Sequence, residues 1–307
     1  MQLSEVGFGA WAIGGKSFGQ VTKRDSMAAL AKAEQLGCNF VDTAAVYGDS
    51  EAIVGEFLQG RRDKWYLATK YSGDQRGMTA VLDEQLQRLK TDYIDFYQIH
   101  WVPNKNDRQL YDELNTLKQA GKVRYIGVSL YNVLDIDYVL AHTNLDGFQV
   151  PFSLLDPHPL LRRINKIRKH NIGVIVRSCL HNGFLTGKYS NTSTFTDEND
   201  QRNKWSPDQI KTAVEMAEQF RFLQQQSGSM AIAAARYPLS FPEVTTVLMS
   251  TKNETQANMN FGDVPKGSLT DDELAQIKNL QNRLGLTDIS PKQHIKELLS
   301  GLKQKYL

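Results

Sequence analysis

Residues 38–51 read CNFVDTAAVYGDSE. The first four are apolar enough for a short buried strand, Asp42 stands where that strand is expected to end, and Tyr47 follows in the loop. A carboxylate and a phenol cost several kcal/mol to bury next to a core unless they are paired. The stretch therefore predicts a reactive site at a strand end. The alternative is a solvated loop in which Asp49 or Ser50 caps the next helix.

Composition places few limits beyond those of an ordinary globular protein. The 307 residues are 41% hydrophobic and 23% charged, and we expect one domain over residues 1–307. A net charge of +2 gives no indication of a nucleic acid or an anionic membrane surface as partner. No apolar run approaches ~18 residues and no signal-peptide pattern is present, so we expect a cytoplasmic protein. Cys38 and Cys179 lie in apolar runs, which is typical of buried thiols rather than of a disulfide or metal site.

Strand-like and helical segments alternate along the whole chain. We expect strands at residues 6–11, 39–42, 64–69, 93–99, 123–128, 147–150, 172–176 and 244–249. Apolar spacing predicts helices between them, at 22–36, 50–58, 82–89, 110–120, 132–141, 160–170, 207–225 and 230–237. Three more are expected after the last strand, at 254–259, 271–284 and 291–305.

This alternation indicates a parallel sheet, and eight strand–helix units in this length favour a closed (β/α)8 TIM barrel with additional C-terminal helices. The alternative is an open doubly wound sheet, which would place a Gly-rich dinucleotide turn after the first strand. Gly7, Gly9 and Ala12 match that turn loosely. However, no helix begins directly at these glycines and no acidic strand end follows ~20 residues later, so the barrel is preferred.

Four side chains of chemical interest fall at or just past the ends of the second, third and fourth expected strands: Asp42, Tyr47, Lys70 and His100. Neighbouring strands lie roughly 5 Å apart, so these groups can converge. A lysine ammonium lowers the pKa of a nearby phenol, and a carboxylate keeps that ammonium in place. Such a phenol can donate a proton to a developing alkoxide, while a neutral histidine donates a second hydrogen bond to the same oxygen.

The motifs around these residues resemble those of the aldo-keto reductases. Asp42 and Tyr47 stand in FVDTAAVYGDSE, Lys70 in LATK and His100 in DFYQIH. Further similar segments are GVS at 127–129, FQVPFSLLD at 148–156 and RSCLHNGFLTGKY at 177–189. The motifs occur in the family's order over most of the chain. Their layout is most similar to the bacterial branch that also resembles potassium-channel β-subunits.

The resemblance implies an NADPH-dependent carbonyl reductase with NADP(H) extended across the strand ends. It implies that Trp11 and Asp42 contact the cofactor, together with residues that hold its successive parts. These are Ser129, Gln149 and Arg177 for the nicotinamide, Ser178, Leu180 and Lys188 for the pyrophosphate, and Ser250, Lys252, Gln256 and Asn260 for the adenosine. An anion at this last position would also benefit from a helix N-terminus. The chain departs from the family at Leu130 and Met259, and a second basic residue beside Lys252 is missing.

The expected partner is a small-molecule carbonyl substrate. By the same resemblance, Trp11, Tyr47, His100 and Trp101 would line the substrate mouth, and no metal is expected. The polar segment at 190–206 shows no periodicity. Long segments of this kind are often lids, so it is expected either to fold over the cofactor or substrate or to be disordered.

We therefore expect reduction of an aldehyde or ketone, with Tyr47 as general acid, Lys70 and Asp42 assisting it and His100 orienting the carbonyl. Two alternatives remain open at this point. One is a barrel lyase or aldolase that uses Lys70 as a Schiff-base nucleophile, although pairing with Asp42 would make the amine a poor nucleophile. The other is a regulatory subunit that binds NADPH with little turnover.

Overall fold

The computed structural model describes residues 1–15, 17–103, 108–131 and 133–287. Within them, eight parallel strands pair in chain order and close into a barrel, so the predicted (β/α)8 fold is confirmed. The strands are β1 Val6–Gly9, β2 Phe40–Asp42, β3 Tyr66–Tyr71, β4 Ile94–Ile99, β5 Val123–Ser129, β6 Gly147–Pro151, β7 Gly173–Arg177 and β8 Thr246–Ser250. Pairing of β1 with β8 over Val6–Gly9 and Val247–Ser250 completes the ring.

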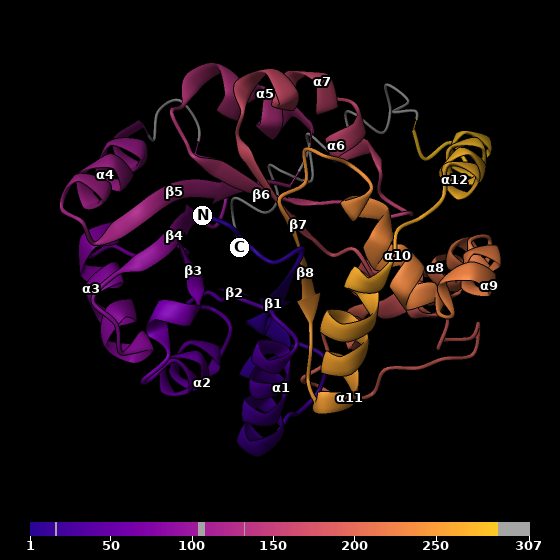
Figure 1. Cartoon of the computed structure of the whole chain (residues 1–307), viewed down its shortest axis with the longest axis horizontal. Coiled ribbons are helices and arrows are strands. Elements are labelled where there is room, and N and C mark those ends of the chain that lie inside the picture. The colour runs from indigo at the N-terminus through magenta and orange to yellow at the C-terminus, as the bar shows by residue number, and fades with distance from the viewer. Residues whose placement is uncertain (16, 104–107, 132, 288–307) are drawn as a thin grey trace.

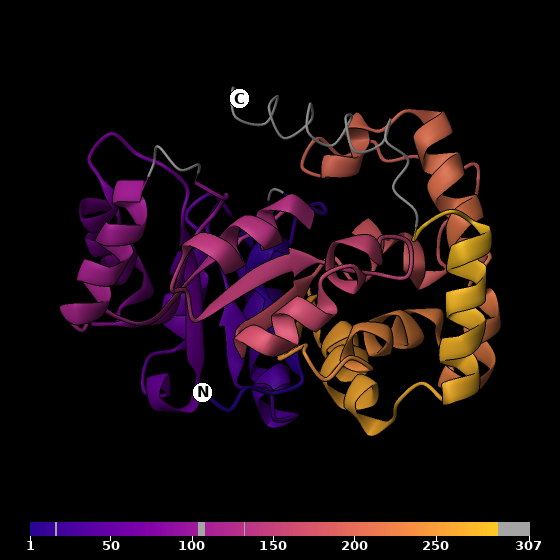
Figure 2. The same cartoon turned by 90° about the horizontal axis from the view of Figure 1, so that it is seen from above.

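Helices surround this ring (Figure 1), and Figure 2 shows the same arrangement from above. They are α1 Lys23–Gln35, α2 Ser50–Phe57, α3 Met78–Leu89, α4 Arg108–Gln119, α5 Val133–His142, α6 His158–Leu161 and α7 Ile164–His170, then α8 Pro207–Glu218, α9 Gln224–Ser227 and α10 Met230–Leu239 between β7 and β8. After β8 come α11 Glu254–Ala257 and α12 Asp271–Arg283. In both views, α8, α9 and α12 gather on the side of the barrel opposite α3 and α4.

Capping side chains stand at the start of two of these helices. The Thr22 side chain accepts a hydrogen bond from the Asp25 amide at the start of α1. Thr270 and Glu273 form a reciprocal capping box at the start of α12. The apolar faces of the helices pack on the outside of the strands, where Leu30, Leu82 and Leu114 are fully buried.

The third strand lies two residues later than predicted. Residues Arg62–Lys64 form a short 3-10 helix, because the Arg62 guanidinium bonds to Asp95 and to the Trp65 carbonyl. At its other end, β3 pairs with β4 as far as Tyr71, so Lys70 does not follow the strand but lies within it, opposite Gln98.

Two predicted helices are interrupted. The one expected at 160–170 is divided into α6 and α7, where Arg163 adopts φ −120° and bonds to Asp137. The one expected at 207–225 ends at Glu218, and a 3-10 turn then buries Phe220 and Leu223 before α9 begins. The helix expected at 291–305 lies outside the described residues.

Close packing between α2 and α3 gives a test of the barrel's outer layer. A Cβ on Gly55 would lie 2.4 Å from the Arg88 carbonyl oxygen. We expect Gly55→Ala to lower the free energy of unfolding by about 1–3 kcal/mol in urea titrations, despite the better helix propensity of alanine. Gly262→Ala is the control, because its Cβ would meet nothing closer than Leu36 at 3.6 Å. Equal effects of the two substitutions would contradict the packing.

Candidate active site

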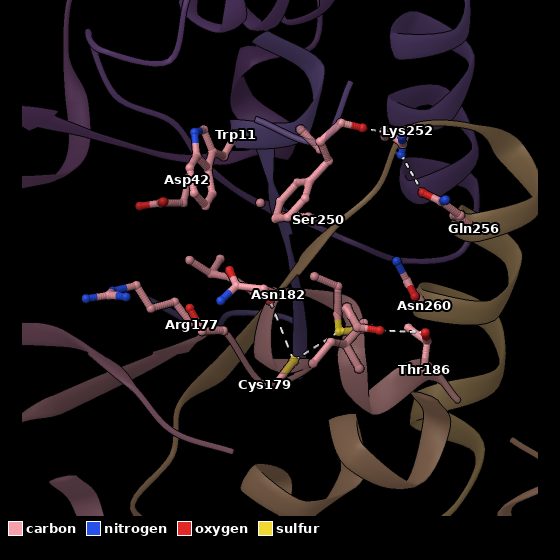
Figure 3. A pocket seen from close by; sticks show the side chains of 18 of the residues that line it. Trp11, Asp42, Arg177, Cys179, Asn182, Thr186, Ser250, Lys252, Gln256 and Asn260 are labelled. Carbon is pink, nitrogen blue, oxygen red and sulfur yellow. Dashed lines mark hydrogen bonds between the residues drawn. The ribbon is translucent and has the colours of Figure 1, made fainter. Parts of the chain in front are cut away.

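A cavity of about 600 Å³ lies at the C-terminal ends of the strands. It is elongated: Trp11, Asp42 and Arg177 lie toward one end, and Lys252 and Gln256 lie toward the other (Figure 3). Most of the predicted site residues line it, namely Trp11, Asp42, Tyr47, His100, Gln149, Arg177, Ser178, Leu180, Lys188, Ser250, Lys252, Gln256 and Asn260.

Three predicted residues are not part of that lining. Lys70 is fully buried behind the wall of the cavity. Ser129 is also buried, opposite Gln149 in the β5–β6 pairing, and its hydroxyl has no partner among the described residues. Trp101 packs on Tyr71, with 5.8 Å between ring centroids.

Lys70 and Asp42 form an ion pair inside the barrel. The Lys70 Nζ donates to Asp42 Oδ2 at 2.5 Å and to the Thr43 carbonyl at 2.8 Å. The second carboxylate oxygen accepts hydrogen bonds from the amide nitrogens of Gln98 and Gln149, each at 3.0 Å. Burial alone would lower the pKa of Lys70, but the charges of Asp42 and Tyr47 and hydrogen bonds to them together outweigh it, so the pKa of the ammonium lies above its ordinary value. Lys70 is therefore a protonated, fixed cation.

Tyr47 lies directly over this cation. The Lys70 Nζ is 5.0 Å from the centroid of the phenol ring, and the ring of Trp11 is 5.9 Å away on another side. Burial is the largest influence and raises the pKa of Tyr47; Lys70 lowers it by less, and Asp42 adds to the rise. The expectation of a net lowering of the phenol pKa was therefore wrong, and the phenol is held in its protonated, proton-donating form.

His100 completes this end of the cavity. Its ring is 5.7 Å from that of Tyr47, edge to face, and its Nδ1 is 3.0 Å from the Ser72 hydroxyl. Burial, followed by the charges of Lys70 and Arg177, lowers the pKa of His100 to about 3. The imidazole is therefore neutral at physiological pH and able to donate one hydrogen bond.

The loops after β7 and β8 build the rest of the cavity, and the loop after β8 carries Lys252 at its far end. Ser178 and Asn182 have positive φ values of 60° and 55°, which turn the chain sharply after β7. After β8, the Lys252 amide donates to Gln256 Oε1 and its ammonium to the Phe18 carbonyl, each at 2.8 Å. The Asn260 amide donates to Thr251, while its buried Oδ1 has no partner among the described residues.

Part of the predicted loop at 190–206 crosses this end. The Gln201 amide donates to the Ser17 carbonyl at 2.9 Å, and Phe18 pairs with Asp200 in an isolated antiparallel bridge. Arg202 is buried, bonded to Asp200 at 2.6 Å and to the Tyr189 hydroxyl at 2.6 Å. Residues 200–202 thus form a strap against the segment after β1.

Sequence reasoning missed several of the residues that line the cavity. Phe18, Asn182 and Tyr131 were not singled out, and Arg202 was covered only by the segment at 190–206. The two-residue spacing of Asp200 and Arg202 was an available signal, because an Asp side chain readily bonds to groups two residues further on.

Residues 5–282 match the family model described as "Aldo/keto reductase family". The chain belongs to this family.

The chain is also similar to individual proteins of this family. The aldo-keto reductase YhdN of Bacillus subtilis is 32% identical over 222 residues, which cover 66% of each protein. The structure of a glycerol dehydrogenase from Gluconobacter oxydans has a TM-score of 0.77 and 29% identity over 94% of both chains. An aldo/keto reductase from Klebsiella pneumoniae, solved with NADP and acetate, has a TM-score of 0.71 and 22% identity over 91% of both chains, a likeness of fold.

The residues that the structure describes contain no helix that combines the length and apolar character needed to cross a bilayer. They also contain no group of three or more His, Cys, Asp or Glu side chains placed to hold a metal ion.

The low pKa of His100 predicts a pH dependence. Between about pH 3 and ~6.5, the pKa of a free histidine, the unfolded chain binds a proton that the folded chain does not. The contribution of this group to stability is therefore fully present above pH ~6.5 and is lost as the pH falls toward about 3. In an NMR titration we expect the His100 ring signals to show no midpoint near pH ~6.5, and a midpoint there would contradict the burial described.

Proposed function

We propose that this protein is an NADP(H)-dependent oxidoreductase that reduces an aldehyde or ketone to an alcohol. The observation that supports this most is the convergence of four groups at one end of the cavity. A protonated lysine paired with a carboxylate lies under a phenol, and a neutral imidazole lies beside it. Family membership supports the same reaction class.

The cavity suits an elongated dinucleotide. One buried polar atom of its lining, Oδ1 of Asn260, has no partner in the described chain. Ser129, Gln149 and Arg177 would hold the nicotinamide, and bound NADPH supplies a hydride there. The other proposed contacts are Trp11 and Asp42 at the same end, Ser178, Leu180 and Lys188 for the pyrophosphate, and Ser250, Lys252, Gln256 and Asn260 for the adenosine.

The chain's own residues would manage the proton and the developing charge. Tyr47 donates its hydroxyl proton to the carbonyl oxygen as that oxygen becomes an alkoxide. Lys70 stabilises the phenolate left behind, and Asp42 keeps the ammonium in position. His100, being neutral, donates a second hydrogen bond to the same oxygen and so fixes the carbonyl's orientation.

Aromatic side chains frame the space above these groups. Trp11, Tyr47 and Tyr131 line the cavity at this end, together with the His100 ring. Walls of this kind suit a small carbonyl compound with an apolar or sugar-like body. We propose an aromatic aldehyde, methylglyoxal and glyceraldehyde as the first substrates to test.

The arrangement of Lys70 argues against a Schiff-base lyase. A Schiff base requires a neutral amine in contact with substrate, but this amine is buried, protonated and bonded to Asp42. A regulatory subunit that binds NADPH would differ from a reductase in its rate of turnover and not in the geometry of the site. Tight NADPH binding without turnover across a broad carbonyl panel would support it.

Tyr47→Phe tests the proposed acid. We expect kcat for NADPH-dependent aldehyde reduction to fall on the order of 10²–10⁴-fold, because the phenyl ring cannot donate a proton. NADPH binding, measured by fluorescence, should be retained.

The matched control is Tyr66→Phe, which removes a hydroxyl from the first residue of β3, at the other end of that strand from Lys70. Its rates should equal those of the unmodified protein. Full turnover by Tyr47→Phe would remove Tyr47 from the mechanism.

A further inference from the structure

Ser72 lies beside the proposed site, yet no role has been given to it. It follows β3 directly, two residues after Lys70. The His100 amide donates to the Tyr71 carbonyl at 2.9 Å, which continues the β3–β4 pairing by one step. This places the Ser72 hydroxyl 3.0 Å from Nδ1 of His100.

The partner of Nδ1 decides what the other ring nitrogen can do. A neutral imidazole has one donor and one acceptor nitrogen. If Ser72 donates to Nδ1 of His100, then Nε2 carries the hydrogen and can donate to a carbonyl oxygen. If Nδ1 donates to Ser72 instead, Nε2 presents a lone pair that repels that oxygen.

The first arrangement is favoured chemically. An imidazole nitrogen is far more basic than a hydroxyl oxygen, so it is the better acceptor of the two and the hydroxyl is the better donor. Among the described residues, the Ser72 hydroxyl makes no other hydrogen bond that would draw its proton away from His100.

We propose that Ser72 is a positioning residue that holds His100 as the tautomer with hydrogen on Nε2. This inference rests on the proposed carbonyl reduction. The end of β3 would then serve the reaction twice: Lys70 supports the acid, and Ser72 sets the donor that orients the substrate.

Substitution of Ser72 separates this role from simple packing. We expect Ser72→Ala to lower kcat for aldehyde reduction about three- to tenfold, the usual effect of one lost hydrogen bond, without changing NADPH affinity. Ser72→Thr keeps the hydroxyl and should restore kcat to within about twofold. Unchanged kcat in Ser72→Ala would overturn the proposal.

A double substitution tests whether Ser72 acts through His100. Glutamine has an amide donor but no tautomers, so in the His100→Gln background Ser72→Ala should have little further effect on kcat. An equally large loss in that background would show that Ser72 acts independently of the imidazole and would contradict the proposal.

The tautomer of His100 can be determined by ¹⁵N NMR of the histidine rings, and this measurement does not require the protein to be catalytically active. We expect Nδ1 of His100 to be unprotonated in the unmodified protein and partly protonated in Ser72→Ala. A protonated Nδ1 in the unmodified protein would refute the inference even if the protein reduces aldehydes. The expected tautomer in a protein without turnover would instead count against the proposed function alone.

Discussion

The salt bridge between Lys70 and Asp42 is the interaction on which the rest of the site depends. Both side chains are removed from water, and an unpaired charge at either position would cost several kcal/mol. Amide groups of Gln98 and Gln149 occupy the remaining carboxylate oxygen, so strands β2, β3, β4 and β6 meet at one pair of charges. The pair therefore fixes both the barrel's interior and the surface on which Tyr47 lies.

The electrostatic consequence differs from that of a free lysine beside a tyrosine. Burial has the largest effect on Tyr47 and raises its pKa, while Asp42 opposes the lowering by Lys70. The same burial lowers the pKa of His100. One enclosed site thus keeps a phenol protonated and an imidazole neutral, which are the forms that donate hydrogen bonds to an oxygen gaining negative charge.

Much of this organisation follows from local sequence. The alternation of strands and helices predicted the barrel, and motifs around residues 42, 47, 70 and 100 indicated the family; both predictions are confirmed. NADP(H) as cofactor belongs to the proposed function, which family membership supports. Four points remain predictions: the roles of individual site residues, the single domain over residues 1–307, the cytoplasmic location and the likeness to potassium-channel β-subunits.

What the sequence did not reveal depends on contacts between distant segments. The shift of the Tyr47 pKa required the degree of burial, and the strap required the contact of Gln201 with Ser17. The 3-10 turn before β3 involves the contact of Arg62 with Asp95, 33 residues away in sequence, and Lys70 lies within β3 through its pairing with Gln98. The sequence around Ser72 did not predict a role for this residue, because the proposed role depends on its contact with His100.

The most direct measurement is the free energy of unfolding of Asp42→Asn, determined by urea titration. This substitution leaves the buried Lys70 ammonium without its counter-charge, and we expect a loss of about 3–5 kcal/mol. Asp263→Asn, which removes an exposed ion pair with Lys266, should cost less than about 1 kcal/mol. Equally small losses from both substitutions would contradict the central place given to the buried pair.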